Sequence, residues 1–292
     1  MSRRAVAAFN PKYSVCVTHY NDAPTVKQSM DSILNQIDES MEVVVVDQRS
    51  TDGSRQVLQE YADSEKIRLF DMRVRNRGLG RQLAFENSRG GHIISGMDMD
   101  DVAIPGRLPL LLDFYHKKCD GDLLRLQWSG VTVAPAELVR KVGGWRDLQW
   151  NENWDLCERA ARIGKYVWTI FRVKDITGSG LTTHADFEGA SVFRKNRLRY
   201  RKYVDALRLR RMHHPFVRGE RFGIGRAIDY GLARISLPYY GRLNSVTPNF
   251  DECAPECFVD SSPWWHTVGQ DERQEIMMYS KLLKRSPDWI TK

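Results

Sequence analysis

At 292 residues and 33.8 kDa the chain is long enough for one large domain, or for one domain with an appendage. Hydrophobic residues make up 42% and charged residues 28%, which is an ordinary balance for a soluble globular protein. No apolar run approaches the ~18 residues of a membrane span, and the apolar patch near the start is shorter than a signal-peptide core of ~7–15 residues. Composition therefore excludes a membrane-spanning protein, and we expect a cytoplasmic one.

The first hundred residues alternate between strand patterns and helix patterns with short connections. The run Val43-Val44-Val45-Val46 is typical of a strand buried on both faces of a parallel sheet. We predict strands over residues 13–18, 43–46, 67–70 and 92–97, with helices beginning near residues 24, 54 and 79. This order predicts βαβ units and a mostly parallel sheet flanked by helices.

The pattern continues more loosely after Pro105. It predicts a helix over residues 108–115, a strand-like stretch over 122–134, a helix over 153–163, a last strand over 166–171, and helices over 196–212 and 271–283. We divide the chain into an α/β domain over residues 1–178 and a basic, mainly helical extension over residues 179–292.

The positive charge lies in one part of that extension. Between Arg194 and Arg226, twelve Lys and Arg residues oppose two acids, a local net charge of +10 in a chain of net +7. Such a stretch binds nucleic acid, docks on an anionic membrane surface, or is a solvated helical face. No RNA-binding motif accompanies it, and apolar residues recur along residues 223–240, so we favour a membrane surface over nucleic acid.

Two acids follow the predicted strand at residues 92–97. In Asp98-Met99-Asp100-Asp101, side chains at i and i+2 of an extended backbone point the same way. Asp98 and Asp100 are then able to converge on Mg²⁺ or Mn²⁺, completed by phosphate oxygens, at the carboxyl edge of the sheet. Acidic pairs also cap helices and occupy turns, so the motif is weak when taken alone.

Six segments stand in a characteristic order: Thr18-His19-Tyr20-Asn21, Asp47 to Ser54, Asn76-Arg77-Gly78, Asp98 to Asp101, Gly143-Gly144-Trp145, and Asn151 to Leu156. This order, over residues 13–165, resembles family 2 glycosyltransferases, which are inverting enzymes of the GT-A fold that use nucleotide-diphosphate sugars. The resemblance implies a GT-A-type, Rossmann-like α/β fold.

The resemblance also implies roles for individual residues. It places Asp98 on the ribose and the metal, Asp100 on Mn²⁺ or Mg²⁺, and His184 as a third metal ligand. Asp47 is expected to accept a hydrogen bond from the base, although it is also placed to cap the next helix. The residues expected to bind the nucleotide sugar are Thr18, Tyr20, Asn21, Asp47, Asn76, Gly78, Arg81 and Asp98.

The family places its catalytic base in an acidic motif, commonly Glu-Asp-x-Asp. Here the stretch is Glu152-Asn153-Trp154-Asp155, so the usual base position carries an amide that accepts no proton at neutral pH. Glu152 and Asp155 share a helix face by spacing, and we predict Glu152 ahead of Asp155 as the base. Both acids also suit the N-terminus of a helix electrostatically.

We therefore predict metal-dependent transfer of a sugar from a UDP- or GDP-linked donor to a glycan or lipid-linked acceptor. The protein would be cytoplasmic, with peripheral contact to the membrane through the basic stretch. Two alternatives stay open. One is a catalytically silent nucleotide-sugar-binding protein, and the other is a sugar-phosphate nucleotidyltransferase, for which the loop after residue 18 lacks the usual glycine-rich sequence.

Overall fold

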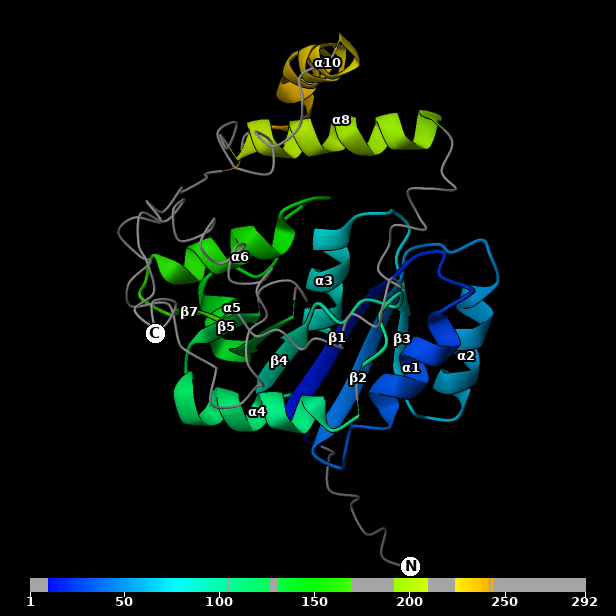
Figure 1. The fold of residues 1–292 in the computed structure, drawn as a ribbon, viewed down its shortest axis with the longest axis vertical. Coiled ribbons are helices and arrows are strands. Elements are labelled where there is room, and N and C mark those ends of the chain that lie inside the picture. Colours follow the sequence, from blue (N-terminus) through cyan, green and yellow to red (C-terminus); the bar gives the residue numbers. More distant parts are fainter. Residues whose placement is uncertain are drawn as a thin grey trace, which may run out of the picture.

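The computed structural model describes residues 10–103, 105–126, 131–169, 192–209, 224–241 and 243. Within these residues seven strands form one sheet in the order β3-β2-β1-β4-β6-β5-β7 (Figure 1). The strands are β1 (Tyr13–His19), β2 (Met41–Asp47), β3 (Arg68–Asp71), β4 (His92–Ser95), β5 (Leu123–Leu126), β6 (Thr132–Pro135) and β7 (Tyr166–Thr169). The helices are α1 (Val26–Leu34), α2 (Ser54–Asp63), α3 (Arg77–Glu86), α4 (Arg107–Lys118), α5 (Ala136–Lys141), α6 (Glu152–Ala161), α8 (Val192–Arg208) and α10 (Ile224–Tyr240).

The sheet is mostly parallel, as predicted. β1 pairs in parallel with β2 and β4, and β2 pairs in parallel with β3. β6 runs antiparallel to β4 and β5, while β7 is parallel to β5. The carboxyl ends of β1, β2, β3 and β4 therefore meet at one edge, where open α/β sheets bind their ligands.

Both faces of the sheet are covered by helices. Along β2, Val43 and Val45 pack into an apolar cluster with side chains of α1, α2 and α4. Val44 and Val46 pack into a second cluster with side chains of α3, α5 and α6. The β-branched run in β2 thus lies in the middle of three layers, which confirms the prediction that it is buried on both faces.

Two predicted strands differ from the structure. The stretch over residues 122–134 is a pair of antiparallel strands, β5 and β6, with Leu124 opposite Val133. A continuous apolar pattern looks the same for one long strand and for two that fold back. β4 ends at Ser95, and residues 98–101 form a turn closed by the Asp101 N–H donating to the Asp98 carbonyl at 3.1 Å. The expectation of an extended backbone at Asp98 and Asp100 was therefore wrong.

The predicted basic helix is α8, which begins at residue 192 and ends at residue 208 rather than spanning 196–212. It packs against α10 through a small apolar cluster that includes Tyr203, Val204 and Ala233. Figure 1 shows α8 between α10 and the α/β body. The Asp205 carboxylate accepts hydrogen bonds from the backbone N–H groups of Gln149 and Trp150, at 2.9 and 3.1 Å, which attaches α8 to the body.

Other predictions for the C-terminal part stay untested. The division at residue 178 and the helix at residues 271–283 lie outside the described residues. Within the described part of the chain, no helix combines the length and the apolar character needed to cross a bilayer.

Candidate functional site

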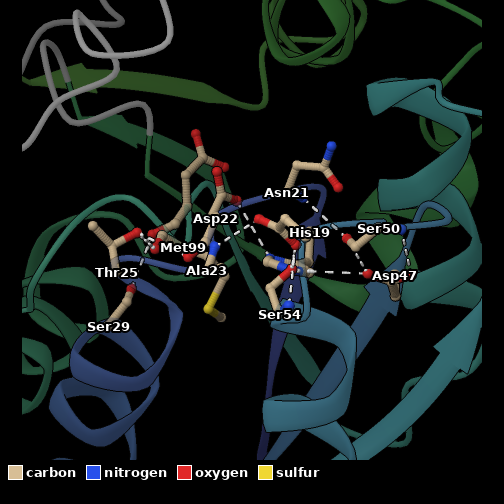
Figure 2. Close-up of polar contacts among 12 residues, drawn as sticks. His19, Asn21, Asp22, Ala23, Thr25, Ser29, Asp47, Ser50, Ser54 and Met99 are labelled. Atoms are coloured by element: carbon tan, nitrogen blue, oxygen red, sulfur yellow. Dashed lines mark hydrogen bonds and ion pairs between the residues drawn. The ribbon is translucent and has the colours of Figure 1, made fainter. Parts of the chain in front are cut away.

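The loops that follow β1 and β2 are joined by hydrogen bonds at the carboxyl edge of the sheet (Figure 2). The Asn21 N–H donates to the Ser50 hydroxyl at 3.0 Å, and the Thr51 N–H donates to the Asn21 side-chain oxygen at 2.7 Å. Asn21 has a left-handed backbone, with φ of 59°, which asparagine tolerates better than most residues. Asn21, predicted to bind the nucleotide sugar, holds this edge of the site in shape.

Asp47 ends β2 inside a buried polar network. It is 1% exposed, and its carboxylate accepts hydrogen bonds from the Ser50 N–H at 3.0 Å and the Ser50 hydroxyl at 2.5 Å. The His19 Nε2 lies 3.8 Å from the Asp47 carboxylate and 2.7 Å from the Ser54 hydroxyl. Figure 2 shows His19, Asp47, Ser50 and Ser54 turned toward one another.

A different acid holds the first residue of α2. Asp52 accepts hydrogen bonds from the Ser54 N–H at 3.0 Å and from the Ser54 hydroxyl at 2.5 Å, and its other oxygen accepts from the Ala23 N–H at 2.8 Å. The Ser50 hydroxyl bonds to Asp47. Asp47 is thus not needed as a helix cap.

Two hydroxyl side chains at the start of helix α1 bind the backbone carbonyls of the acidic turn. The Thr25 hydroxyl donates to the Met99 carbonyl at 2.9 Å, and the Ser29 hydroxyl donates to the carbonyls of Asp98 and Asp101 at 3.3 and 2.5 Å. Our sequence reasoning missed both hydroxyls. Their i, i+4 spacing on one helix face was the available signal. These hydrogen bonds occupy the backbone carbonyls of the turn and leave its carboxylates available for other partners.

The turn concentrates negative charge. Met99 is 1% exposed, whereas the side chain of Asp98 is 45% exposed. Burial, together with the charges of Asp98 and Asp22, raises the pKa of Asp100 to about 6. Burial and the charges of Asp100 and Asp98 raise the pKa of Asp101 to about 7. A hard divalent cation is the natural counter-charge for such a set of oxygen donors.

A third protein ligand for that cation is not found among the described residues. In this part of the chain, neither Asp98 nor Asp100 belongs to a group of three His, Cys, Asp or Glu side chains whose ligand atoms all lie within 4.8 Å of one another. His184 lies outside the described residues, so its predicted role stays a prediction. Asp98 and Asp100 fit a cation that is completed by phosphate oxygens of a ligand.

Arg81 connects the acidic turn to helix α6. Its side chain is buried, with Nη2 at 3.3 Å from the Asp98 carboxylate and Nε at 3.2 Å from the Glu152 carboxylate. A third nitrogen, Nη1, donates to the Ser95 hydroxyl at 3.2 Å. Arg81 therefore pairs with two predicted site acids, and direct contact between Arg81 and phosphate stays a prediction.

Asp98, Arg81 and Glu152 line one open cavity of about 230 Å³. The full lining consists of Arg77, Arg81, Gly96, Asp98, Arg125, Trp150, Asn151, Glu152, Asn153 and Trp154. The structure thus brings a predicted metal ligand and the favoured predicted base to the same cavity. Asp47, Asn76 and Asp155 are not part of this lining.

Glu152 and Asp155 both stand in the first turn of α6, but they have different partners. Asp155 is 1% exposed and forms ion pairs with Arg146 and Arg159, the second at 2.9 Å. Glu152 pairs with Arg81 and lines the cavity. The shared helix face that their spacing indicated does not give them a shared site.

Asn153, in the position where the family commonly has an acid, also lines the cavity. Its side-chain oxygen accepts a hydrogen bond from the indole N–H of Trp145 at 2.8 Å. This contact orients the Asn153 amide, and a carboxylate oxygen would be able to accept the same hydrogen bond.

Asn76 and Gly78 bring α3 against the loop at residues 146–149. Asn76 caps α3 by accepting from the Leu79 N–H at 2.9 Å, and its amide donates to Asp147 at 2.6 Å. The Gly78 N–H donates to the Leu148 carbonyl at 2.9 Å, and a Cβ at Gly78 would overlap the carbonyl of Arg146. Their expected contact with the nucleotide sugar stays a prediction.

Two further predicted residues lie at the end of β1. Thr18 is 9% exposed, and a Cβ added at Gly80 would come within 2.9 Å of its methyl group. The Tyr20 ring carries the Arg75 guanidinium at 4.0 Å from its centroid. Neither residue lines the 230 Å³ cavity, so their contact with a ligand stays a prediction.

Gly78→Ala is expected to destabilise the protein by about 1–3 kcal/mol, because the added methyl group must push the Arg146 carbonyl away. Urea unfolding of the natural chain and of Gly78→Ala measures the difference in the free energy of unfolding. Gly231→Ala is the matched control, since a methyl group added at this position of α10 meets nothing within 4 Å. That change should be neutral or should stabilise the helix by up to about 1 kcal/mol. Equal effects from both changes would contradict the close approach at Gly78.

Arg125 is a site residue that our sequence reasoning missed. It lies in β5, is 8% exposed, and stacks over the Trp154 ring at 4.3 Å from the centroid. Its Nε and Nη1 atoms are buried and have no hydrogen-bond partner, although Arg125 lines the cavity. The available signal was a lone cation inside the apolar run Leu123 to Leu126.

A parallel sheet with an acidic turn and a polar cavity at its carboxyl edge defines a ligand-binding α/β protein of the nucleotide-binding type. The chain belongs to glycosyl transferase family 2, whose family model matches residues 14–175. The match covers all of the sheet except the first residue of β1, and it includes every predicted site residue except His184.

Curated relatives match part of the chain. An uncharacterised glycosyltransferase, MJ1057, of Methanocaldococcus jannaschii is 31% identical over 118 residues, which are 39% of this chain and 40% of that protein. Chondroitin synthase of Escherichia coli is 31% identical over 108 residues, which are 37% of this chain and 16% of that protein. The chain therefore matches less than half the length of these relatives.

Solved structures with the same fold extend further along the chain. The mannosyltransferase PcManGT of Pyrobaculum calidifontis, solved with GDP-Man and Mn²⁺, has a TM-score of 0.51 at 15% identity. The matched region covers 97% of this chain and 84% of the PcManGT chain. TarS of S. aureus has a TM-score of 0.50 at 15% identity and covers 96% of this chain and 50% of its own. At these identities the likeness concerns the fold, and it confirms the predicted GT-A architecture.

Proposed function

We propose that this protein is a metal-dependent, inverting glycosyltransferase that uses a nucleotide-diphosphate sugar. One observation carries the proposal. Buried Arg81 joins the Asp98 carboxylate, at 3.3 Å, to the Glu152 carboxylate, at 3.2 Å, and all three side chains line one cavity. A metal-side acid and a candidate base thus face the same space, as direct displacement requires.

The donor occupies the carboxyl edge of the sheet in this proposal. Asp47 reads a base N–H from the end of β2, the base being uracil or guanine. Asp98 would contact the ribose, and Asp98 and Asp100 would hold Mn²⁺ or Mg²⁺ beside the diphosphate. A bound ion of this kind offsets the negative charge that develops on the departing diphosphate.

Transfer then proceeds in one step at the anomeric carbon. Glu152 accepts the proton of an acceptor hydroxyl while that oxygen bonds to the anomeric carbon and the bond to the diphosphate breaks. Arg81 orients the Glu152 carboxylate in this scheme. Asp155 is a structural residue, because it is buried between Arg146 and Arg159.

Arg125 adds a second buried positive charge to the lining of the cavity. Its unpaired Nε–H and Nη1–H groups are proposed donors to an anionic group, either the donor diphosphate or a phosphate of the acceptor. Buried N–H groups without acceptors are costly, and an anionic ligand removes that cost.

Nucleotide binding tests the donor half of the proposal. UDP or GDP with Mn²⁺ is expected to raise the melting temperature. At a ligand concentration of 100 Kd, binding adds about 2.7 kcal/mol to the free energy of unfolding. Asp47→Ala should weaken the nucleoside diphosphate and leave inorganic pyrophosphate unaffected, with Ser50→Ala as a control for the turn. Equal losses for nucleotide and pyrophosphate would show that Asp47 does not read the base.

A second candidate function is binding of a nucleotide sugar without turnover. The observation that favours it is Asn153, which lines the cavity and carries no titratable proton acceptor. Retention of Glu152 in the cavity favours the active enzyme. Turnover by the natural chain and by Asn153→Asp separates the two.

We further propose that α10 docks the protein on an anionic membrane surface that carries a lipid-linked acceptor. Four apolar residues 4, 3 and 4 positions apart form one exposed stripe, namely Ile228 (58% exposed), Leu232 (51%), Ile235 (77%) and Tyr239 (88%). Exposed Arg234 lies within the same helix. Arg208 of α8 has a structural role instead, since it is 4% exposed and pairs with Asp205.

Co-sedimentation with liposomes measures this docking. Binding to anionic vesicles is expected to exceed binding to neutral ones and to fall with salt, because exposed charges are screened within ~8 Å at physiological ionic strength. Ile235→Asp should reduce binding at least about tenfold by removing apolar contact and adding negative charge. Ile163→Asp, at a 43% exposed position on the body, should have no effect. Equal binding to neutral and anionic vesicles would contradict the proposal.

A further inference from the structure

Two histidines and an aspartate meet at the amino edge of the sheet, opposite the proposed active site. His92 is the first residue of β4, and Asp120 follows the C-terminal end of α4, near His116. The chain runs from His92 along β4 before it reaches the Asp98 turn, so the two places lie at opposite ends of the strand. None of the three residues lines the 230 Å³ cavity.

Three donor atoms of these side chains converge. The His116 Nδ1 lies 3.2 Å and the His92 Nε2 lies 3.9 Å from the Asp120 carboxylate, and the three donors all lie within 4.8 Å of one another. Around a tetrahedral ion with bonds of about 2.0–2.1 Å, neighbouring donors are ~3.3 Å apart. Small side-chain rotations bring the observed donors to that separation. Among the described residues this is the one group of three with such convergence.

The ring of His116 is held from behind. Its Nε2 lies 2.5 Å from the Tyr13 hydroxyl, on the side away from Asp120. Metal-binding histidines usually make such a second hydrogen bond, which sets the tautomer and directs the other nitrogen at the ion. Tyr13 belongs to β1, so the arrangement links two strands and α4.

The ring of His92 is also fixed in place. It packs edge-on against Tyr115, with centroids 5.7 Å apart, and against His116, with centroids 5.4 Å apart. Its Nδ1 is buried without a hydrogen-bond partner, so the polar contacts of the ring are made through Nε2, the atom that faces Asp120. Ring packing therefore holds His92 beside Asp120, and a small side-chain rotation would complete the donor set around an ion.

We propose that His92, His116 and Asp120 form a structural site for Zn²⁺ or a similar transition-metal ion, completed by water. Two imidazoles and one carboxylate suit this class of ion, whereas the all-oxygen set at Asp98 and Asp100 suits Mg²⁺ or Mn²⁺. The side chain of Asp120 is 60% exposed, so solvent reaches the remaining position. The ion would fasten the end of α4 to the start of β4.

The experiment uses the full chain with Asp100→Ala, which removes the other proposed metal site, after treatment with a chelator. Calorimetry with Zn²⁺ is expected to show one bound equivalent, and Co²⁺ to give visible bands of a four-coordinate site without thiolate charge transfer. Added Zn²⁺ should raise the melting temperature by mass action. Binding that depends on a thiolate, or no binding at all, would overturn the assignment.

Single substitutions locate the ion. Asp120→Ala and His116→Ala are expected to weaken Zn²⁺ binding more than about 100-fold, and Tyr13→Phe about 10-fold or more, as for partners behind a ligand. Asp113→Ala is the matched control, since this exposed acid of α4 contacts Lys117. The Asp120 side chain is 60% exposed, so its variant tests the site even if a histidine variant unfolds. Unchanged Zn²⁺ affinity in Asp120→Ala would overturn the proposal.

Discussion

Asp100→Ala is expected to remove Mn²⁺-dependent binding of UDP or GDP while leaving the fold intact. Loss of a residue behind a metal ligand costs about 10–100-fold in affinity, so loss of a direct ligand should cost more than ~100-fold. Crowded by Asp98 and Asp22, the Asp100 carboxylate is not expected to stabilise the metal-free protein. Calorimetric titration of each nucleotide, with Mn²⁺ and with chelator, measures the difference.

Two controls sharpen this result. Asp63→Ala removes an exposed acid at the end of α2 that accepts a hydrogen bond from Gln59, and it should leave nucleotide affinity unchanged. Affinity measured in chelator should be equally weak for the natural chain and for Asp100→Ala. If Asp100→Ala binds as tightly as the natural chain in Mn²⁺, the acidic turn does not hold the metal.

Glu152→Gln is expected to lower kcat by ~10²–10⁴-fold, the usual contribution of a positioned general base. Donor affinity should change little, because a base acts only as the acceptor loses its proton. Arg81 keeps the Asp98 carboxylate, at 3.3 Å, as a charged partner, and the glutamine oxygen is still able to accept from its Nε, so the fold should persist. Steady-state kinetics and nucleotide titration of the same preparation separate these effects.

Asp155→Asn supplies the contrast. Asp155 is 1% exposed and pairs with Arg146 and Arg159, and breaking a buried ion pair by removing one partner typically costs about 3–5 kcal/mol. The expected result is a lower melting temperature, with kcat close to normal for the folded fraction. A normal melting temperature together with a collapse of kcat would make Asp155 the base in place of Glu152.

Asn153→Asp separates the active enzyme from the silent binding protein. In an active enzyme this change should be neutral or mildly activating, because a carboxylate retains the acceptor for the Trp145 indole N–H. In a silent protein the natural chain would bind the donor without transfer or hydrolysis, and Asn153→Asp would gain donor hydrolysis. The second pattern would overturn the proposed activity.

The sequence by itself predicted most strands and helices of the α/β part and the class of fold. These elements were visible because burial follows local periodicity, such as the β-branched run in β2 and the apolar face of α1. β5 and β6 were read as one stretch, because periodicity reports burial and does not report where a buried chain reverses direction.

The sequence also placed the acidic residues at strand ends, and parallel pairing brings those ends together. The extended backbone that we expected at Asp98 to Asp101 is a turn instead, because Thr25 and Ser29 of α1 bind its carbonyls. The spacing of Thr25 and Ser29 is visible in the sequence, but the carbonyls that they bind lie far away along the chain, so only the fold shows the pairing.

Only the tertiary structure decided how the two candidate bases differ. Their spacing makes Glu152 and Asp155 equivalent, and nothing local shows which one faces Arg81 and which one is enclosed by Arg146 and Arg159. The same holds for Arg125, an ordinary charged residue in sequence and, in the fold, a buried cation with unpaired N–H groups at the cavity. Burial and charge pairing depend on which elements pack together, so the chemistry of these side chains follows from the packing.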